Sequence, residues 1–261
     1  MKKPSKEFLE TTYYCDLHNP AIRNLAERLT LDLTVDKMKA IRLFYWVRDN
    51  ILYSVGNWKK KASETLKSHV GTCTNKANLL VALLRVSGIP AGYRVLRVKG
   101  RDYFGPIAPP SLIHRVRANT VHIHAYAFLN DKWIKCDPSD DIALSKKTSY
   151  FNPQSKVVEW DGENDAELNL DTTHIIEDLG LFSNVDHWIG KRPRYSKAIV
   201  VSLGNLYIKF LREYEEIIHD INILERHFKH WLRKHYPLHY IILHVDAAIY
   251  KLWVSIKKPF V

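Results

Sequence analysis

The segment that most restricts the fold runs from Cys73 to Pro90 and carries a wide apolar stripe at helical spacing. It reads Cys-Thr-Asn-Lys-Ala-Asn-Leu-Leu-Val-Ala-Leu-Leu-Arg-Val-Ser-Gly-Ile-Pro. Gly88 and the proline two residues later are typical of a helix C-terminus. The alternation from Tyr93 to Val98 then predicts a strand. We therefore expect an apolar helix that starts at Cys73 and is followed by a strand.

The position of Cys73 at the start of this helix indicates a reactive thiol. The first N–H groups of a helix have no partner within the helix, and the positive end of the helix dipole lies there. Both effects favour thiolate over thiol, and cysteines in such settings have pKa values of about 3.5 to 7.5. Cys73 is therefore the candidate nucleophile.

A nucleophilic thiol needs a base, and a predicted hairpin supplies one. Two alternating segments, 121–129 and 132–137, flank a two-residue turn at 130–131. With that turn, His124 lies directly opposite Asp137, at a Cβ separation of roughly 4.5 to 5.5 Å. A carboxylate so placed can bond the imidazole and hold it in one tautomer.

The sequence therefore predicts a triad of Cys73 as nucleophile, His124 as base and Asp137 as the group that orients the histidine. His122 lies on the same face of the strand and would oppose Ser139, which makes it the alternative base. We expect His124 rather than His122, because only His124 is directly opposite the carboxylate.

Four segments resemble the transglutaminase-like superfamily. They are the lead-in Trp46-Val-Arg-Asp-Asn-Ile-Leu-Tyr53, the nucleophile helix with its flanks from Gly71 to Tyr93, the strand with His124-Ala-Tyr, and Trp133-Ile-Lys-Cys-Asp-Pro-Ser139. The resemblance covers about residues 38–140. It implies an α+β, papain-like core in which the nucleophile helix packs on an antiparallel sheet, and thiol chemistry on a peptide or protein amide.

The chain departs from the large animal transglutaminases of that superfamily. The residue after Cys73 is threonine rather than an aromatic residue, and flanking β domains do not fit in this length. Calcium dependence is therefore not implied, and the small microbial protease or amidase members are closer. An oxyanion would be bound by the Cys73 N–H and by a second donor, for which Tyr53 and Trp58 are both candidates.

We expect a core domain over residues 1–190 and a helical C-terminal extension over 191–261, packed on the core. The extension holds 13 of the 39 Lys and Arg residues but only 6 of the 28 Asp and Glu residues. Its basic face is interpreted as a solvated surface, with weak contact to anionic membrane or polyanion as the alternative. No specific nucleic-acid recognition is predicted.

Composition restricts the class of protein and its compartment. The chain is 46% hydrophobic and 26% charged, the proportions of a globular protein. Its three cysteines, Cys15, Cys73 and Cys136, are not a disulfide framework, and neither a signal peptide nor a membrane span is evident. We expect a cytoplasmic protein.

No cofactor or metal is expected. A zinc site would have to draw on His69, Cys73, His122, His124 and Cys136, which lack the usual ligand spacings. The acidic run 161–167 does not have the spacing of an EF-hand calcium loop and is interpreted as a solvated loop.

The function expected from the sequence is hydrolysis of a peptide or other amide through a thioester on Cys73. Acyl transfer from glutamine to an amine is the first alternative, because the same acyl-enzyme could be resolved by an amine. A non-catalytic module that binds through its basic C-terminal segment is the second.

Overall fold

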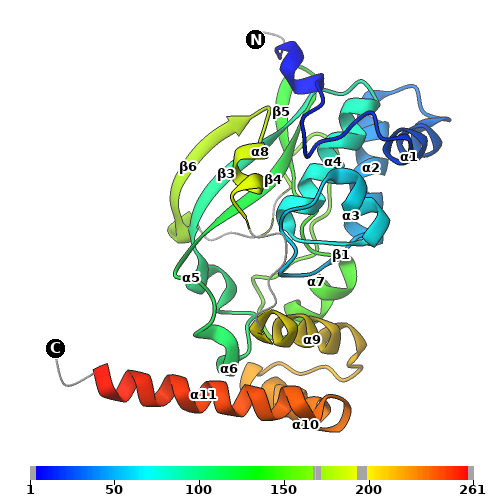
Figure 1. The fold of residues 1–261 in the computed structure, drawn as a ribbon. Helices are drawn as coiled ribbons and strands as arrows, with labels where there is room; N and C mark the ends of the chain where they lie inside the picture. The colour runs from blue at the N-terminus through cyan, green and yellow to red at the C-terminus, as the bar shows by residue number, and fades with distance from the viewer. Residues whose placement is uncertain (1–3, 167, 169–171, 193–198, 258–261) are drawn as a thin grey trace.

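The computed structural model describes the chain except for residues 1–3, 167, 169–171, 193–198 and 258–261 (Figure 1). Its centre is a four-stranded antiparallel sheet in the order β5-β4-β3-β6. The strands are β3 (Ala91–Lys99), β4 (Asn119–Leu129), β5 (Lys132–Cys136) and β6 (Ile175–Phe182). The predicted α+β class is confirmed, as are the three strands predicted from the sequence. The edge strand β6 was not expected.

The β4–β5 hairpin has the predicted register. Leu129 pairs with Lys132, and Ala125 pairs with Cys136. Both turn residues, Asn130 and Asp131, have positive φ angles, of 49° and 60°. Such a pair is typical of a type I′ turn, whose twist matches that of the strands it joins.

Helix α4 (Cys73–Val86) packs against the sheet and forms the middle of the main hydrophobic core (Figure 1). The helix begins with a capping box between Thr72 and Asn75. At its end Gly88 adopts a φ of 81°, and its N–H and that of Ile89 bond back to the last turn of the helix. The predicted helix is therefore confirmed at both ends.

Further elements of the N-terminal half enclose α4. They are η1 (Lys6–Leu9), α1 (Pro20–Thr30), α2 (Asp36–Asn50), β1 (Leu52–Tyr53), α3 (Ala62–Ser68) and β2 (Val70–Gly71). Helix α2 ends at Asn50, and Leu52 and Tyr53 pair in parallel with Val70 and Gly71. This short pairing brings Tyr53 next to the turn that leads into Cys73.

The segments around the sheet contain several short helices. Residues 99–119 include α5 (Gly100–Phe104) and α6 (Pro110–Ile113). After β5 follow α7 (Ile142–Ser149), η2 (Thr172–His174) and α8 (Asp186–Gly190). Residues 156–160, between α7 and η2, lack regular structure.

The C-terminal part forms three helices, α9 (Ile199–Glu213), α10 (Ile221–His235) and α11 (Pro237–Lys257). Helix α9 is tied to the loop after β1. The Asn205 side chain accepts from the Val55 N–H at 2.9 Å and donates to the Val55 carbonyl at 3.0 Å. Arg212 donates to the Tyr53 carbonyl at 2.8 Å and forms an ion pair with the buried Asp141.

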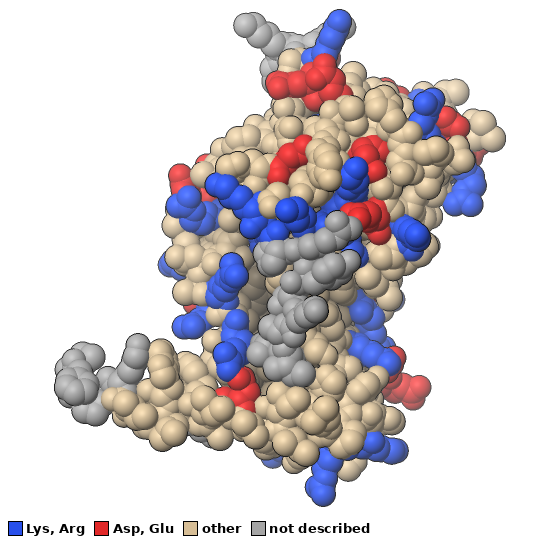
Figure 2. Space-filling view, viewed as in Figure 1, with Lys and Arg blue, Asp and Glu red and all other residues tan. Residues whose placement is uncertain are grey.

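The outer faces of α10 and α11 differ in character. Arg226, Arg233 and Lys234 are exposed on α10, as the basic composition suggested. On α11 the exposed residues include an apolar series at helical spacing, namely Leu238, Ile241, Val245, Ile249, Leu252 and Ile256. Figure 2 shows α11 as a mostly uncharged band along the lower edge of the molecule. Of the helices in the described part of the chain, none combines the length and apolar character needed to cross a bilayer.

Asp141 is the residue whose loss should most weaken the attachment of α9. Its carboxylate accepts from Tyr53 N–H at 2.9 Å and from Leu144 N–H at 3.0 Å, in addition to the ion pair with Arg212. Removing one partner of a buried ion pair costs about 3 to 5 kcal/mol. We predict that Asp141→Asn lowers the free energy of unfolding in urea by about 3 kcal/mol.

Glu213→Gln is the matched control, since Glu213 lies on α9 itself and its side chain is 54% exposed and 3.8 Å from Lys209. It should change the free energy of unfolding by less than about 0.5 kcal/mol. Equal effects of the two substitutions would contradict the anchoring role given to Asp141.

Candidate active site

Cys73 occupies the first position of α4, where the helix N-terminus faces a cavity. The cap holds this turn in place. The Thr72 N–H donates to the Asn75 side-chain oxygen at 3.0 Å, and the Asn75 side-chain amide donates to the Trp58 carbonyl at 2.9 Å. Gly71 precedes this turn, and a side chain there would lie 2.9 Å from the Asn75 Cβ. The glycine therefore permits the tight approach that fixes Cys73.

His122 and Asp137 form a buried pair beside the thiol. The His122 Nε2 atom lies 2.9 Å from the Asp137 Oδ2 atom, and both residues are at most 2% exposed. The second carboxylate oxygen accepts from the Ser139 N–H at 3.0 Å and from the Ser139 hydroxyl. With Nε2 bonded to the carboxylate, Nδ1 is the ring nitrogen left for Cys73.

The expected hydrogen bond between His124 and Asp137 is not present, although the hairpin register was right. The β4–β5 ladder ends at Cys136, and the Asp137 N–H donates instead to the Ala166 carbonyl at 2.9 Å. The chain leaves the strand there, so the carboxylate reaches the diagonal neighbour His122 rather than His124.

His124 is fully buried and stacks on Tyr126, with the two ring centroids 5.7 Å apart. Neither of its ring nitrogens has a hydrogen-bond partner in the described part of the chain. Burial lowers the pKa of His124 to about 3, which makes it a neutral ring at ordinary pH. Among the described residues, His122 lines the cavity with Cys73 and His124 does not.

The charges of the three grouped side chains support one another. Burial acts to raise the pKa of the Cys73 thiol, but the hydrogen bond to His122 and the charge of its ring outweigh this and lower that pKa. Burial likewise opposes charge on His122, yet Asp137 and the Cys73 thiolate hold the pKa of His122 well above its usual value. The pKa of Asp137 is held below its ordinary value by His122, against the effect of burial. The arrangement favours a thiolate–imidazolium pair.

A metal ion is the other group that these side chains could hold. Nitrogen and oxygen atoms of His122, His124 and Asp137 lie within 4.8 Å of one another. The zinc set considered from the sequence is not assembled, since Cys136 faces the core and the exposed His69 lies within 3.3 Å of the Asn50 carbonyl. Both oxygens of Asp137 are already bonded by His122 and Ser139, which suits an orienting carboxylate better than a ligand.

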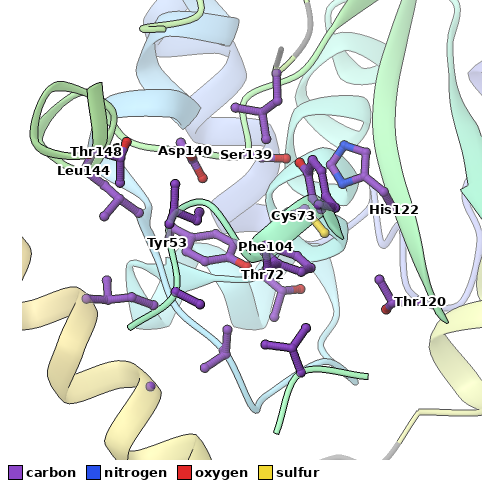
Figure 3. Close-up of a pocket in the computed structure, with 18 of the residues that line it drawn as sticks. Tyr53, Thr72, Cys73, Phe104, Thr120, His122, Ser139, Asp140, Leu144 and Thr148 are labelled. Carbon is purple, nitrogen blue, oxygen red and sulfur yellow. Dashed lines mark hydrogen bonds between the residues drawn. The ribbon is translucent and has the colours of Figure 1, made fainter. Parts of the chain in front are cut away.

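The cavity has a volume of about 580 Å³ and lies between the part of the protein that contains the four-stranded sheet and helix α9. In Figure 3, Cys73 and His122 lie on one side, Leu144 and Thr148 of α7 on the other, and Tyr53 with Phe104 between them. Burial, followed by the charge of Cys73, raises the pKa of Tyr53 well above its usual value. Tyr53 therefore lies within the electrostatic field of the thiol. Trp58 also lines the cavity, so both expected oxyanion donors are present in its wall.

Residues 23–138 match the family model of the transglutaminase-like superfamily. This segment is similar to the core of that superfamily. It contains Cys73, His122 and Asp137 together with the helix and hairpin that position them. The match supports a thiol enzyme at the level of the family.

Solved structures similar to the chain include two bacterial proteins. A candidate cysteine protease from Cytophaga hutchinsonii has 24% identity and a TM-score of 0.40, over 50% of this chain and 40% of that chain. A candidate protease from Parabacteroides distasonis has 16% identity and a TM-score of 0.35, over 52% of this chain and 25% of that chain. The matched region is thus less than half of each of those chains. No curated protein matches the sequence.

Three further groups around the transglutaminase-like site were not anticipated from the sequence. Arg192 lines the cavity, and its charge helps to lower the pKa of Cys73. Asp140 also lines it, and burial raises the pKa of its carboxyl to about 6. The ring of Tyr103 lies 5.8 Å from that of His122. The Asp-Pro-Ser-Asp run could have drawn attention to Asp140, whereas no local pattern indicates Arg192 or Tyr103.

The thiolate–imidazolium pair predicts how Cys73 reacts with iodoacetamide as pH changes. Because only the thiolate reacts, the rate should rise with pH around a midpoint below the free-thiol value of about 8.5. His122→Gln should move the midpoint upwards, since it removes the hydrogen bond and the charge that lower the pKa.

The matched control is His124→Gln, which should leave the midpoint almost unchanged. Cys15 and Cys136 are buried and burial raises the pKa of each thiol, so mass spectrometry should find the label on Cys73. An ordinary midpoint in the parent protein, or a larger shift in His124→Gln than in His122→Gln, would contradict the arrangement.

Proposed function

We propose that the chain is a thiol-dependent amide hydrolase in which Cys73, His122 and Asp137 act as a triad. The observation that carries the proposal is a group of three side chains: a thiol at a helix N-terminus, an imidazole that lines the same cavity and lowers the pKa of that thiol, and a buried carboxylate bonded to the imidazole. The thiol and the imidazole both line one cavity. A buried, charged pair is expensive to maintain, and a purely structural hairpin has no need of it.

In the first half of the proposed reaction the Cys73 thiolate attacks the amide carbonyl carbon. The negative charge that develops on the carbonyl oxygen is stabilised by the Cys73 N–H and by a second donor, for which the Tyr53 hydroxyl is favoured by its place in the field of the thiol. His122 donates its proton to the departing nitrogen, and the amine leaves. The acyl group then remains on Cys73 as a thioester.

In the second half, water enters and neutral His122 takes a proton from it. The resulting hydroxide attacks the thioester, the C–S bond breaks, and the carboxylic acid product leaves. Asp137 bonds the His122 Nε2 atom throughout and stabilises the imidazolium each time it forms. Ser139 in turn fixes the carboxylate through its N–H.

Acyl transfer is the second candidate, because an amine could replace water in that second half. The predominantly apolar wall of the cavity favours it, since limited access of water prolongs the life of a thioester. The two reactions share every step up to the thioester. Adding methylamine during turnover separates them: a transferase gives mainly the methylamide product, and a hydrolase gives mainly the acid.

Substitutions should distinguish the residues of the triad, which turnover requires, from their neighbour His124, which it does not. With a library of acyl-peptide aminomethylcoumarin amides, Cys73→Ala should abolish release of the fluorophore, and His122→Ala should lower kcat/KM by at least about 10³-fold. His124→Gln should retain turnover within about tenfold, since His124 does not line the cavity.

Far-ultraviolet circular dichroism and urea unfolding of each variant check that the fold is kept. Turnover that survives Cys73→Ala would contradict the proposed mechanism. Turnover lost in His124→Gln but kept in His122→Ala would return the role of base to His124.

A further inference from the structure

The cavity extends well beyond the groups that would carry out the chemistry. From Cys73 and His122 it continues past Phe104 to Leu144 and Thr148, with α9 as its lower wall (Figure 3). Its volume of about 580 Å³ falls within the range of pockets that hold a drug-sized molecule, roughly 300 to 1,000 Å³. The reacting atoms of an amide occupy little of this space.

The wall of the cavity is predominantly apolar. Much of its apolar surface comes from two segments far apart in sequence, the Pro-rich segment 104–112 and helix α9. Their apolar side chains facing the cavity include Phe104, Ile107, Leu112, Val201, Ile208 and Leu211. An apolar surface of this kind binds hydrocarbon in preference to water.

Contacts at three positions fix helix α9, so this wall of the cavity is part of the folded structure. Asn205 makes two hydrogen bonds with the Val55 backbone, at 2.9 and 3.0 Å. Two residues further on, Tyr207 packs edge-on against Phe228 of α10, with ring centroids 5.2 Å apart. At the end of the helix, Arg212 is paired with the buried Asp141. Helix α9 is therefore fixed both to the N-terminal part of the chain and to α10.

The cavity is continuous with the nucleophile, so its occupant is a part of the substrate. In a thioester mechanism the acyl part stays on the enzyme while water attacks, whereas the amine part must leave. An apolar cavity suits the part that stays.

We propose that the substrate of Cys73 carries an extended apolar group on the acyl side of the amide, and that this group lies between segment 104–112 and α9. This inference rests on the proposed function of Cys73 as nucleophile. A fatty-acyl chain and a run of apolar peptide side chains share this chemistry.

Alkyl chloromethyl ketones test the proposal directly, because their carbonyl carries the alkyl group on the acyl side. The thiolate displaces chloride: the S–C bond forms as the C–Cl bond breaks, and chloride leaves. The methyl, n-pentyl and n-undecyl ketones would be reacted with the full chain. Each rate constant for labelling of Cys73 would be divided by that for free cysteine.

Each methylene that enters an apolar site can raise the rate constant up to about fourfold. We therefore expect the normalised rate constant to rise at least about tenfold from methyl to n-pentyl and to rise again with n-undecyl. Normalised rate constants that do not depend on chain length, with the methyl ketone reacting faster than with free cysteine, would overturn this inference alone. A methyl ketone that reacts no faster than with free cysteine would instead contradict the proposed function.

A matched pair of variants on α9 tests where the alkyl group of the reagent binds. Ile208→Gln places a polar side chain in the cavity wall and should lower the ratio of n-undecyl to methyl rate constants at least fivefold. Lys209→Gln changes the next residue, which is exposed and bonded to Tyr236, and should keep that ratio.

Should Ile208→Gln fail to fold, Gly204→Leu serves in its place. Gly204 lines the cavity, and a Cβ there makes only ordinary contact with Val55 at 3.4 Å. The added leucine would occupy cavity space and lower the same ratio. A ratio unchanged in the cavity variants would overturn the assignment of the apolar group to this wall.

Peptide reagents identify the source of the apolar group. Acetyl-Leu-Leu and acetyl-Gly-Gly chloromethyl ketones would be compared under the same conditions. A gain from leucine larger than that from n-pentyl indicates an apolar peptide, and a larger gain from the alkyl series indicates a fatty-acyl chain. Either gain supports the proposal, and no gain in either series overturns it.

Discussion

A carboxylate with no exposure to solvent lies at the end of β5, and the arrangement of the candidate site depends on how that charge is paired. Removing a carboxylate from water is costly unless charged or hydrogen-bonding groups replace the water. Asp137 gains these from the His122 ring and from the N–H and hydroxyl groups of Ser139. The pairing fixes the plane of the imidazole and retains its positive charge. That charge lies beside the N-terminus of α4. It lowers the pKa of the Cys73 thiol, so that Cys73 ionises more readily than an ordinary thiol.

The cavity around the candidate site is formed by segments that lie far apart in the sequence. Helix α9 approaches the nucleophile through a bond network that joins Arg212, Asp141 and Tyr53, residues separated by 71 and 88 positions along the chain. The Pro-rich segment 104–112 lines the cavity as well. Basic side chains gather around the narrow middle of the molecule, between the sheet-bearing body and α9–α11 (Figure 2). Helix α9 therefore belongs to the surroundings of the site and also, with α10 and α11, to a second hydrophobic cluster.

Much of the core could be predicted because its signals are local. The helix from Cys73 is defined by spacing and by Gly88, and the hairpin register follows from its two-residue turn. Choosing between His122 and His124 required more, since both lie on one face of β4. The choice depends on where the ladder ends, and that is set by a hydrogen bond from Asp137 to Ala166, 29 residues further along the chain. Period-2 alternation contains no information about such a contact.

Strand β6 escaped prediction for a related reason. Its central residues are Glu177, Asp178 and Gly180, which disfavour a strand locally. Pairing with β3 and ion pairs with Arg94 and Arg97 stabilise it at the edge of the sheet. The cavity wall on α9 was equally inaccessible, because apolar spacing does not reveal whether a helix faces a packed core or an open cavity.

The central claim is that Asp137 keeps His122 charged beside Cys73, and ring nitrogen chemical shifts of ¹⁵N-labelled His122 measure this most directly. The signals would be assigned with His122→Gln and followed across pH in the parent protein and in Asp137→Asn. We expect an imidazolium at neutral pH in the parent protein, titrating above the ordinary histidine value of about 6.5. In Asp137→Asn burial should dominate, so that the pKa of His122 falls below that value. A neutral His122 ring in the parent, or a titration that Asp137→Asn leaves unchanged, would contradict the claim.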